Sequence, residues 1–306
     1  MKKLYQKLLE ELRAMKDGPE VLTDEPMSSH TSFRLGGNAD VFITPRSTYQ
    51  AAEVISAVRR SGLPYFILGN GSNLLVSDSG YRGVIVRLDR NISDVRVDGD
   101  LITAEAGASL SSIASAARNA SLTGFEFASG IPGTLGGAVV MNAGAYGGEM
   151  KDVVEEAEVL TPEGKRISIP GSELGFGYRQ SIIKSSGYVV LSAALRLKKG
   201  NREEIIAQMK DLQQRRISKQ PLEFPSAGST FKRPAGYFAG KLIEDAGLRG
   251  FSVGGAKVSD KHCGFVINTG SASASDVYNL IREVAGRVKA QSGVTLEPEV
   301  LFLGDF

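Results

Sequence analysis

The 306-residue sequence predicts an α+β protein with more than one domain. Its expected strands and helices follow one another in a mixed order, whereas a single doubly wound sheet would require regular alternation. One strand-helix-strand unit near the beginning is followed by a series of short strands joined by hairpin turns. With 42% hydrophobic and 23% charged residues, the chain has the composition of a globular protein that buries a large core.

The first twenty residues predict an amphipathic helix. Apolar side chains recur there at helical spacing, at Leu4, Leu8, Leu12 and Met15. Charged residues interrupt any apolar stretch of the length that a signal peptide needs, at Lys7, Glu10 and Glu11. We therefore expect this helix to pack on the body of the protein rather than to anchor it in a membrane.

A βαβ unit is predicted next. Residues 39–44 and 64–68 have the apolar character of strands. Between them, Ser47 is suited to cap a helix that runs to about Arg60, and Gly62 stands where such a helix ends. Strands joined through a helix usually run in parallel, so we expect residues 39–44 and 64–68 to pair.

Short strands dominate the next part of the chain. They are predicted at residues 83–88, 95–97, 101–106, 157–160, 166–169 and 189–197. Turn residues at 98–100 and 161–164 predict two hairpins, and residues 109–119 predict a helix.

A charged stretch near residue 200 marks an expected domain boundary. Beyond it the pattern predicts a helix to about residue 216, a helix over 238–246, a strand over 264–268 and a terminal strand over 296–303. A long helix with one apolar face is expected to begin at Ser275, as its cap, and to end at Gln291 before Gly293.

The counts of charged residues, cysteine and histidine exclude several classes of protein. The net charge of +2 is too small for nucleic-acid binding that rests on bulk charge. One Cys rules out a disulfide framework and is typical of a reducing, cytoplasmic location. With only two His beside it, we expect no metal site. The longest uncharged run, residues 127–148, contains seven Gly and a Pro and is therefore not a membrane helix.

Two glycine-rich segments are candidates for binding a ligand. Residues 69–73 (GNGSN) directly follow a predicted strand, where backbone N–H groups can face a phosphate, although the motif is neither a Walker A loop nor a dinucleotide-binding fingerprint. Residues 128–148 are so rich in Gly that we expect no helix there, but chain packed tightly against a large rigid ligand. Together they could clamp a diphosphate-bearing cofactor. From spacing alone, a structural turn and a glycine-rich core crossing remain open.

Three further segments contain residues suited to chemistry. Arg179 adjoins apolar sequence and should need an anionic or carbonyl partner, unless it lies on an exposed strand. Ser229 lies in a compact loop between two Pro, where a plain structural turn is the default because no GxSxG elbow is present. Glu297 and Glu299 share one face of the terminal strand, either as functional carboxylates or as a solvated edge.

Neighbouring His262 and Cys263 form a further pair of reactive residue types. Consecutive residues of a strand point to opposite faces, so we do not expect them to act as a dyad.

These segments, taken together, resemble the UDP-N-acetylenolpyruvoylglucosamine reductase family over nearly the whole chain, from about residue 31 to residue 303. Three resemble the family's flavin-binding segments: TSFRLGGNAD (31–40), GNGSNLLVSD (69–78) and GIPGTLGGAVVMNAGAYGGEM (130–150). Three resemble its active-site segments: GYRQSI (177–182), SAGSTFKRP (226–234) and LEPEV (296–300). Each is weak alone, but six in the family's order are specific. The chain resembles the shorter class of the family, which lacks an extra Tyr-bearing loop.

The resemblance implies an FAD-binding fold of the vanillyl-alcohol oxidase / p-cresol methylhydroxylase type in two subdomains, plus a smaller α+β substrate-binding domain. After the helix of residues 1–20, the FAD-binding domain is expected at 21–199, with subdomains at about 21–88 and 89–199. The substrate-binding domain is expected at 200–285. Residues 286–306 are expected to return to the FAD-binding core.

The resemblance also implies the reaction. NADPH reduces FAD, and flavin N5 then gives hydride to the methylene carbon of UDP-N-acetylglucosamine enolpyruvate, which becomes UDP-N-acetylmuramate for peptidoglycan synthesis. Ser229 would donate the proton, Arg179 would bind the substrate carboxylate, and Glu299 would assist proton delivery or bind the enol-like intermediate. The expected partners are thus the sugar nucleotide and NADPH, with no nucleic acid and no membrane insertion.

The remaining site residues follow from the same motifs. Cofactor contacts are expected from Gly69, Asn70, Gly71, Ser72, Asn73, Ile131, Pro132, Gly133, Thr134, Gly136, Gly137, Asn142, Ala143, Gly144 and Gly147. Substrate contacts are expected from Tyr178, Lys219 and Lys232. Arg233 stands where many relatives have Asn, which leaves its nucleotide contact open.

Two other functions are compatible with such a fold. One is an FAD-dependent oxidase or dehydrogenase of the same superfamily, which would not need the set Arg179, Ser229 and Glu299. The other is a non-catalytic flavin- or sugar-nucleotide-binding regulator, which the loss of one of the three would favour. All three are present.

Overall fold

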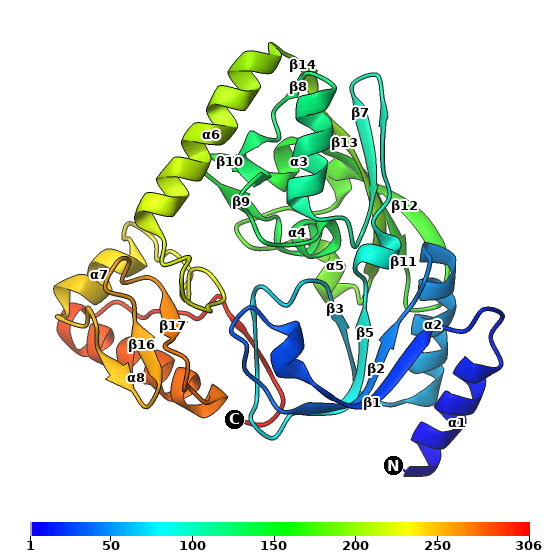
Figure 1. Ribbon diagram of the computed structural model, residues 1–306, viewed down its shortest axis with the longest axis horizontal. Helices are drawn as coiled ribbons and strands as arrows, with labels where there is room; N and C mark the ends of the chain where they lie inside the picture. The colour runs from blue at the N-terminus through cyan, green and yellow to red at the C-terminus, as the bar shows by residue number, and fades with distance from the viewer. Residues whose placement is uncertain (1) are drawn as a thin grey trace. The chain divides into compact units, whose positions relative to one another are not determined.

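The computed structural model describes residues 2–306, which divide into two compact units. Unit 1 comprises residues 2–22, Val41–Gly69 and Gly83–Arg215. Unit 2 comprises Thr23–Asp40, Asn70–Arg82 and Arg216–Phe306. Each unit is therefore assembled from three separate pieces of chain, which can be followed by colour in Figure 1.

Unit 1 holds most of a four-stranded sheet with the order β1-β2-β5-β3. Its strands are β1 (Glu20–Pro26), β2 (Asn38–Thr44), β3 (Tyr65–Leu68) and β5 (Tyr81–Arg87). The predicted pairing of β2 with β3 is wrong, because β5 lies between them and pairs in parallel with β3. Four consecutive buried residues, 83–86, suit β5 to this inner position, where both faces are covered.

Two helices of unit 1, α1 (Lys2–Arg13) and α2 (Thr48–Ser61), pack against each other. Helix α2 begins and ends as predicted: Ser47 Oγ accepts a hydrogen bond from the Gln50 N–H at 3.2 Å, and Gly62 takes the left-handed conformation at the C-terminus. Helix α1 packs against α2 (Figure 1) and buries Leu8 and Leu12. The expected packing role of α1 is confirmed.

The second sheet of unit 1 is antiparallel, with the order β12-β11-β13-β7-β6. Its strands are β6 (Val95–Asp98), β7 (Leu101–Glu105), β11 (Val154–Leu160), β12 (Arg166–Pro170) and β13 (Val189–Arg196). Both predicted hairpins are confirmed. Helix α3 (Leu110–Asn119), capped by Ser109, packs against β6 and β7 (Figure 1).

Helix α4 (Leu135–Met141) corrects the expectation that residues 128–148 contain no helix. Its buried side chains are Leu135, Ala138 and Val139, and the helix packs against β13. A Cβ atom on Gly136 would come 3.1 Å from the Ala106 Cβ atom, so the missing side chain permits a close approach to the sheet. Burial of the apolar face thus offsets the low helix propensity of two Gly.

Short elements complete unit 1. They are β8 (Leu122–Thr123), which pairs with β14 (Lys198–Lys199), β9 (Gly144–Ala145), which pairs with β10 (Gly148–Glu149), and α5 (Ile182–Ser185). Helix α6 (Arg202–Lys219) begins in unit 1 and ends in unit 2. Within residues 2–306, no helix has both the length and the apolar character to cross a bilayer.

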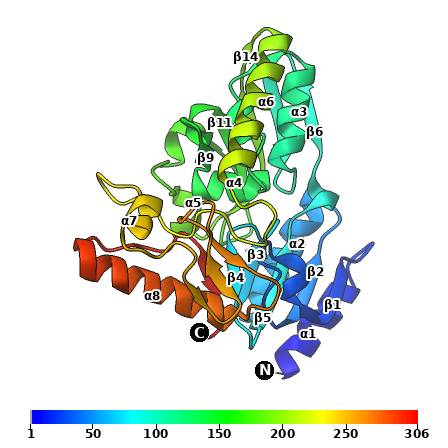
Figure 2. The ribbon, with the colours of Figure 1, turned by 60° about the vertical axis from the view of Figure 1, so that its left-hand side comes forward.

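Unit 2 is built around the long helix α8 (Ala274–Ser292), which packs along the antiparallel sheet β15-β16-β17 (Figure 1). Figure 2 shows the length of α8 from a second side. The strands are β15 (Ser252–Val253), β16 (Ala256–Val258) and β17 (Val266–Asn268), and α7 (Ala239–Asp245) also contacts α8. The predicted C-terminal stop at Gly293 is confirmed, but the cap is Ser273 rather than Ser275. Ser273 forms a capping box with Asp276, whereas the Ser275 hydroxyl donates to Asp78 at 2.6 Å.

The terminal strand is shorter than predicted. Strand β18 covers only Leu301–Leu303 and pairs in parallel with β4 (Leu74–Val76), also in unit 2. Upstream, Pro298 makes a single bridge with Phe231, since a proline cannot donate to a strand ladder. The units also divide at residues 215/216 rather than near 200, and residues 286–306 belong to unit 2. The division into FAD-binding and substrate-binding domains stays a prediction.

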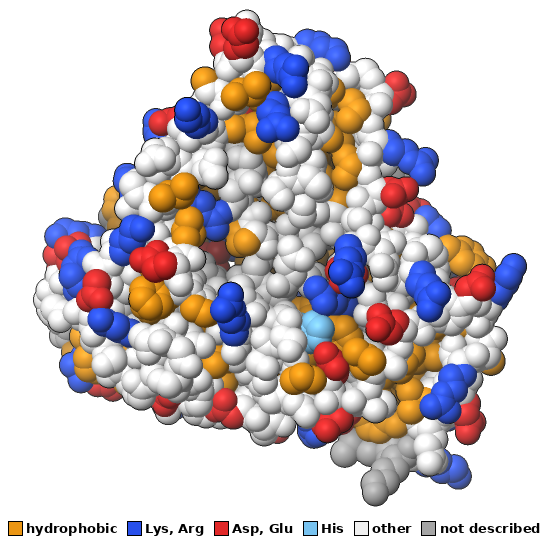
Figure 3. Space-filling model, viewed as in Figure 1, with side chains coloured by type: hydrophobic (Ala, Val, Ile, Leu, Met, Phe, Trp, Pro, Cys, Tyr) orange, Lys and Arg blue, Asp and Glu red, His pale blue; other side chains and the backbone are white. Residues whose placement is uncertain are grey.

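Charged side chains of both signs are interspersed over the face of the molecule that Figure 3 shows. This distribution agrees with the balanced count of 36 basic and 34 acidic residues.

Candidate active site

The two glycine-rich segments meet in unit 1. A Cβ atom on Gly69, at the end of β3, would come 2.4 Å from the Thr134 hydroxyl oxygen, which lies just before α4. That the two segments clamp a cofactor stays a prediction. The reason for glycine at 69 is nevertheless packing against Thr134, so this position does not itself require a ligand.

The glycines of α4 and of the following loop differ in what surrounds them. The N–H groups of Leu135 and Gly136 donate to the carbonyls of Ala108 and Ala106, so these two groups serve the fold. A Cβ atom on Gly147, by contrast, would meet nothing within 4 Å, and one on Gly137 would approach only the Thr134 hydroxyl, at 3.8 Å. Both glycines are exposed, so a ligand such as a flavin could approach the backbone at these two positions.

The remainder of the first glycine-rich segment lies in unit 2, where protein contacts fix it. Gly71 has φ +60°, and a Cβ atom there would come 2.0 Å from the His30 carbonyl oxygen. The Asn73 amide donates to the Glu299 carbonyl at 3.1 Å, and the Leu301 N–H donates to the Asn73 carbonyl at 3.0 Å. Residues 70–73 are thereby joined to the segment that contains Glu299.

Arg179 lies in a tight turn of unit 1. The turn is closed by two backbone hydrogen bonds, from the Gly177 N–H to the Gln180 carbonyl at 3.0 Å and from the Gln180 N–H to the Gly177 carbonyl at 3.2 Å. Arg179 has φ +55°, an uncommon conformation for a residue with a side chain. Its guanidinium lies 5.4 Å from the centre of the Tyr178 ring and 3.5 Å from the Gly144 carbonyl. Arg179 is therefore half-buried beside the second glycine-rich segment rather than on an exposed strand.

A carboxylate lies near this arginine. The ion pair with Lys151, at 2.8 Å, is the main cause that holds the pKa of Glu149 below its usual value, with further lowering by the Asn142 amide and the charge of Arg179. Burial opposes this shift without reversing it. Glu149 therefore stays ionised at neutral pH and contributes a negative charge beside Arg179.

Ser229 and Glu299 occupy adjacent segments of unit 2. The Glu299 N–H donates to the Thr230 carbonyl at 2.8 Å, and the Lys232 N–H donates to the Glu297 carbonyl at 2.9 Å. Thr230 is fully buried, and its hydroxyl accepts the Val266 N–H at 2.9 Å. Ser229 itself is exposed, so its hydroxyl is available to a ligand. The structure thus pairs the segments that contain two of the three predicted catalytic residues, Ser229 and Glu299.

The candidates for substrate contact lie in both units. Tyr178 is 52% exposed in the Arg179 turn of unit 1. In unit 2, Lys232 pairs with Glu297 at 3.1 Å, and Lys219 ends α6. Arg233, whose role the sequence left open, lies over the Phe238 ring at 4.1 Å.

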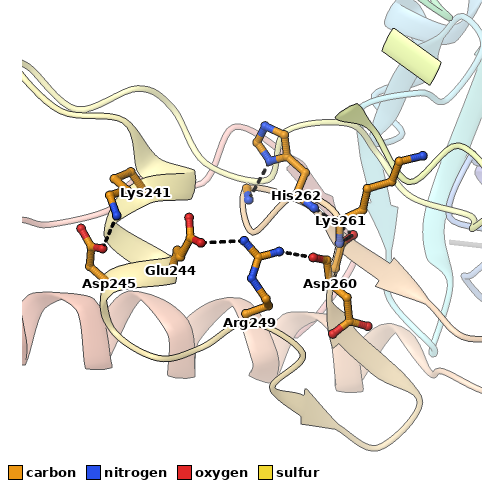
Figure 4. A network of polar contacts seen from close by, with 9 residues as sticks. Lys241, Glu244, Asp245, Arg249, Asp260, Lys261 and His262 are labelled. Carbon is orange, nitrogen blue, oxygen red and sulfur yellow. Dashed lines mark hydrogen bonds and ion pairs between the residues drawn. The ribbon is translucent and has the colours of Figure 1, made fainter. Parts of the chain in front are cut away.

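His262 belongs to a polar network around α7 (Figure 4). Arg249 joins Glu244 of α7 to the Asp260 carbonyl, and His262 Nδ1 accepts the Gly264 N–H at 3.0 Å. Burial lowers the pKa of His262, and the charges of Arg249 and Lys219 lower it further, while burial raises the pKa of the Cys263 thiol. Both side chains are thus neutral at pH 7. Over residues 2–306, no group of three His, Cys, Asp or Glu side chains is placed to hold a metal ion.

Comparison with known proteins assigns the family. A model of the UDP-N-acetylenolpyruvoylglucosamine reductase C-terminal domain matches residues 220–303, and a model of an FAD binding domain matches residues 39–169. A UDP-N-acetylenolpyruvoylglucosamine reductase from Lachnoclostridium phytofermentans is 54% identical over 302 residues, which are 97% of this chain and 97% of the relative. The chain belongs to the UDP-N-acetylenolpyruvoylglucosamine reductase family.

Other members of the family agree. The reductase from Caldanaerobacter subterraneus is also 54% identical, over 97% of this chain and 98% of its own. The crystal structure of the reductase from Thermus caldophilus has a TM-score of 0.79 at 36% identity and covers 94% of this chain and 99% of its own. This family member is accordingly a flavin-dependent oxidoreductase with FAD as cofactor. It has the expected α+β fold with an FAD-binding domain.

Sequence reasoning missed several residues that hold this site. Thr230 was part of a motif but had no role, and Glu149 was not considered. Asn142 was expected to contact the cofactor, yet both N–H groups of its side chain are used by protein acceptors. A signal was available for Asn142, because an Asn directly after an apolar helical run is suited to a left-handed helix end.

Proposed function

We propose that this protein reduces UDP-N-acetylglucosamine enolpyruvate to UDP-N-acetylmuramate with NADPH, a step of peptidoglycan precursor synthesis. The observation that carries the proposal is the pairing of the Ser229 and Glu299 segments through backbone hydrogen bonds of 2.8 and 2.9 Å. Such pairing supports a proton donor and a carboxylate at one substrate. The cytoplasmic location stays a prediction.

FAD, when bound, would supply hydride transfer between NADPH and the methylene carbon of the enolpyruvyl group. The exposed backbone at Gly137 and Gly147 is open to ligand contacts at these two positions. Residues 69–73 and 131–147 would contribute backbone contacts, and within them the N–H groups of Leu135 and Gly136 and the Asn142 amide also bond to other parts of the protein.

Arg179 would bind the substrate carboxylate. A planar, permanently charged guanidinium can donate two parallel hydrogen bonds to a carboxylate and can stabilise the charge that develops when the neighbouring double bond receives hydride. Its half-buried position beside the Tyr178 ring and the Gly144 carbonyl supports this role, because such surroundings restrict the side chain before substrate arrives.

Ser229 would donate the proton to the carbon next to the carboxylate. A hydroxyl is a weak acid, but the acceptor is a strongly basic enolate, so a well-placed hydroxyl suffices. Glu299 would assist by binding the enol-like intermediate or by returning a proton to Ser229. Tyr178, Lys219 and Lys232 would contact the sugar nucleotide, where two ammonium groups suit a diphosphate.

The test is turnover by the purified protein loaded with FAD. NADPH consumption should require UDP-N-acetylglucosamine enolpyruvate, and UDP-N-acetylglucosamine, which lacks the enolpyruvyl group, should not replace it. NADPH consumption that is independent of either sugar nucleotide would instead favour another flavin oxidoreductase. FAD binding without any turnover would favour a regulator.

A further inference from the structure

Asn142 is a buried residue whose side-chain amide bonds to three protein groups. It is 1% exposed, and it ends α4 in the left-handed conformation, with φ 44° and ψ 55°. Its Oδ1 accepts the Lys151 N–H at 2.9 Å, and its Nδ2 donates to Glu149 Oε2 at 2.9 Å and to the Gly177 carbonyl at 3.0 Å. The amide orientation is fixed by this pattern, because the reversed amide would place an oxygen against two acceptors.

The Gly177 carbonyl is the point at which Asn142 reaches the Arg179 turn. That oxygen already accepts the Gln180 N–H at 3.2 Å, so the amide supplies its second hydrogen bond. A further side-chain anchor of the turn is the Ser181 hydroxyl, which donates to the Val140 carbonyl at 2.8 Å. With Ser181 in place, loss of the Asn142 bond should shift the turn without releasing it.

We infer that Asn142 is a positioning residue that holds the Arg179 turn in register with the second glycine-rich segment, and that Glu149 orients the Asn142 amide for this task. The inference rests on the proposed role of Arg179 in binding the substrate carboxylate. A left-handed Arg179 is conformationally costly, and the bond to the Gly177 carbonyl is one of the contacts that maintain it.

The central variant is Asn142→Asp, which keeps the shape but turns an oxygen toward the Gly177 carbonyl and Glu149. We expect KM for UDP-N-acetylglucosamine enolpyruvate to rise by about tenfold, the equivalent of one lost hydrogen bond that aligns a charged group. The rate of flavin reduction by NADPH, measured separately by stopped-flow absorbance, should change far less than KM does, because this step does not use the substrate carboxylate. Asn142→Gly keeps the left-handed backbone without strain and serves if the Asn142→Asp variant folds poorly. It should likewise raise KM for the sugar nucleotide with little effect on flavin reduction by NADPH.

The double variant Asn142→Asp/Glu149→Gln separates positioning from stability. The amide introduced at position 149 can donate to the carboxylate introduced at position 142. This restores the hydrogen bond between the two side chains, with donor and acceptor exchanged. Nothing restores the bond to the Gly177 carbonyl. We expect the melting temperature to recover and KM to remain raised. Recovery of both, or an unchanged KM in all three variants, would overturn the inference.

Two reference variants make the outcomes distinguishable. Arg179→Lys should raise the same KM by more than Asn142→Asp does; if it has no effect, the proposed role of Arg179 fails, and the Asn142 variants then report on stability only. Asn201→Asp is the matched control, because Asn201 acts through its Oδ1, as acceptor from the N–H groups of Glu203 and Glu204, a task that a carboxylate serves equally well. Both kinetic half-reactions should be unchanged in that control.

Discussion

The Arg179 turn of unit 1 and the Ser229 segment of unit 2 hold their key residues in different ways. Arg179 adopts a left-handed conformation in a turn that side-chain groups from Asn142 and Ser181 anchor. Ser229 lies in a segment that backbone hydrogen bonds of the neighbouring Thr230 and Lys232 join to residues 297–299. One region thus depends on particular side chains, whereas the other depends mainly on main-chain register.

The difference predicts how each region responds to substitution. A backbone ladder survives most changes of side chain, because every residue except proline carries the same donor and acceptor. An amide that serves three partners has no such tolerance, because neither Asp nor Ala reproduces its pattern. Substitutions in the Ser229 segment should therefore affect either the chemical step or the stability of unit 2. Substitutions around Arg179 should affect how the Arg179 guanidinium is aligned with the substrate carboxylate.

The largest effect is expected for Ser229→Ala. Removal of the proposed proton donor should lower kcat by about 10³-fold, within the range for a positioned general acid. The register of the segment should persist, because its backbone bonds remain, so the melting temperature should not change. Stopped-flow absorbance should show normal flavin reduction by NADPH and slow reoxidation by the enolpyruvyl sugar nucleotide.

Ser226→Ala, in the same loop, is the matched control. Ser226 makes a backbone bridge to Ile267 and has no proposed role in chemistry, so its variant should retain normal reoxidation. Equal losses in both variants would mean that the loop, rather than the Ser229 hydroxyl, is what the reaction needs.

A smaller effect, on stability rather than chemistry, is expected for Thr230→Val. This change keeps the shape but leaves the buried Val266 N–H without its acceptor, which should cost about 1–3 kcal/mol in free energy of unfolding. Urea denaturation measures this loss. Thr269→Val, at an exposed hydroxyl, should stay within about 0.5 kcal/mol. A large loss of kcat in the Thr230 variant would contradict the view that main-chain register alone holds Ser229.

The smallest effect is expected for Asp78→Ala. Burial tends to raise the pKa of Asp78, but hydrogen bonds from the Ser275 hydroxyl and N–H and from the Ala274 N–H outweigh it, so the pKa lies below its ordinary value. The carboxylate therefore stabilises the start of α8 above the pKa of the unfolded chain, and this contribution is lost as pH falls through the lower folded pKa. The variant should lose about 1 kcal/mol at pH 7.

The pH dependence distinguishes this contribution from simple packing. The stability difference between wild type and Asp78→Ala should be constant above about pH 5 and should shrink below about pH 4. Urea denaturation across this range measures it. A difference that stays the same down to about pH 2, below the ordinary range of an Asp pKa, would show that the charge of Asp78 contributes nothing.

Most elements of the fold could be predicted from local signals. The helix α2, with Ser47 at its start and Gly62 at its end, and the two hairpins follow directly from caps and turn residues. Errors arose where distant packing decides. Nothing near β2 or β3 shows that β5 inserts between them, and α4 forms despite two glycines because β13 covers its apolar face. The cap of α8 was misplaced by two residues because Ser275 and Ser273 look equally suitable without Asp78 in view.

The candidate site could be predicted only in part. The closeness of the Ser229 and Glu299 segments agrees with the sequence motifs, whereas the cofactor contacts of the two glycine-rich segments stay a prediction. The supporting residues could not be found in this way, because the Asn142 amide and the Thr230 hydroxyl act through partners 35 and 36 positions away. Motifs identify groups that face a ligand more readily than groups that face the protein.

The parallel pairing of β18 with β4 has a consequence for the order of events during protein synthesis. Strand β4 leaves the ribosome early, whereas its partner Leu301–Leu303 and the Asp305 carbonyl that accepts from the Ser77 hydroxyl are made among the last residues described. Unit 2 can therefore reach its native form only when nearly all of these residues have been translated. Until then, the apolar residues of β4 lack the strand that pairs with them, and exposed apolar strands of this kind are prone to aggregate.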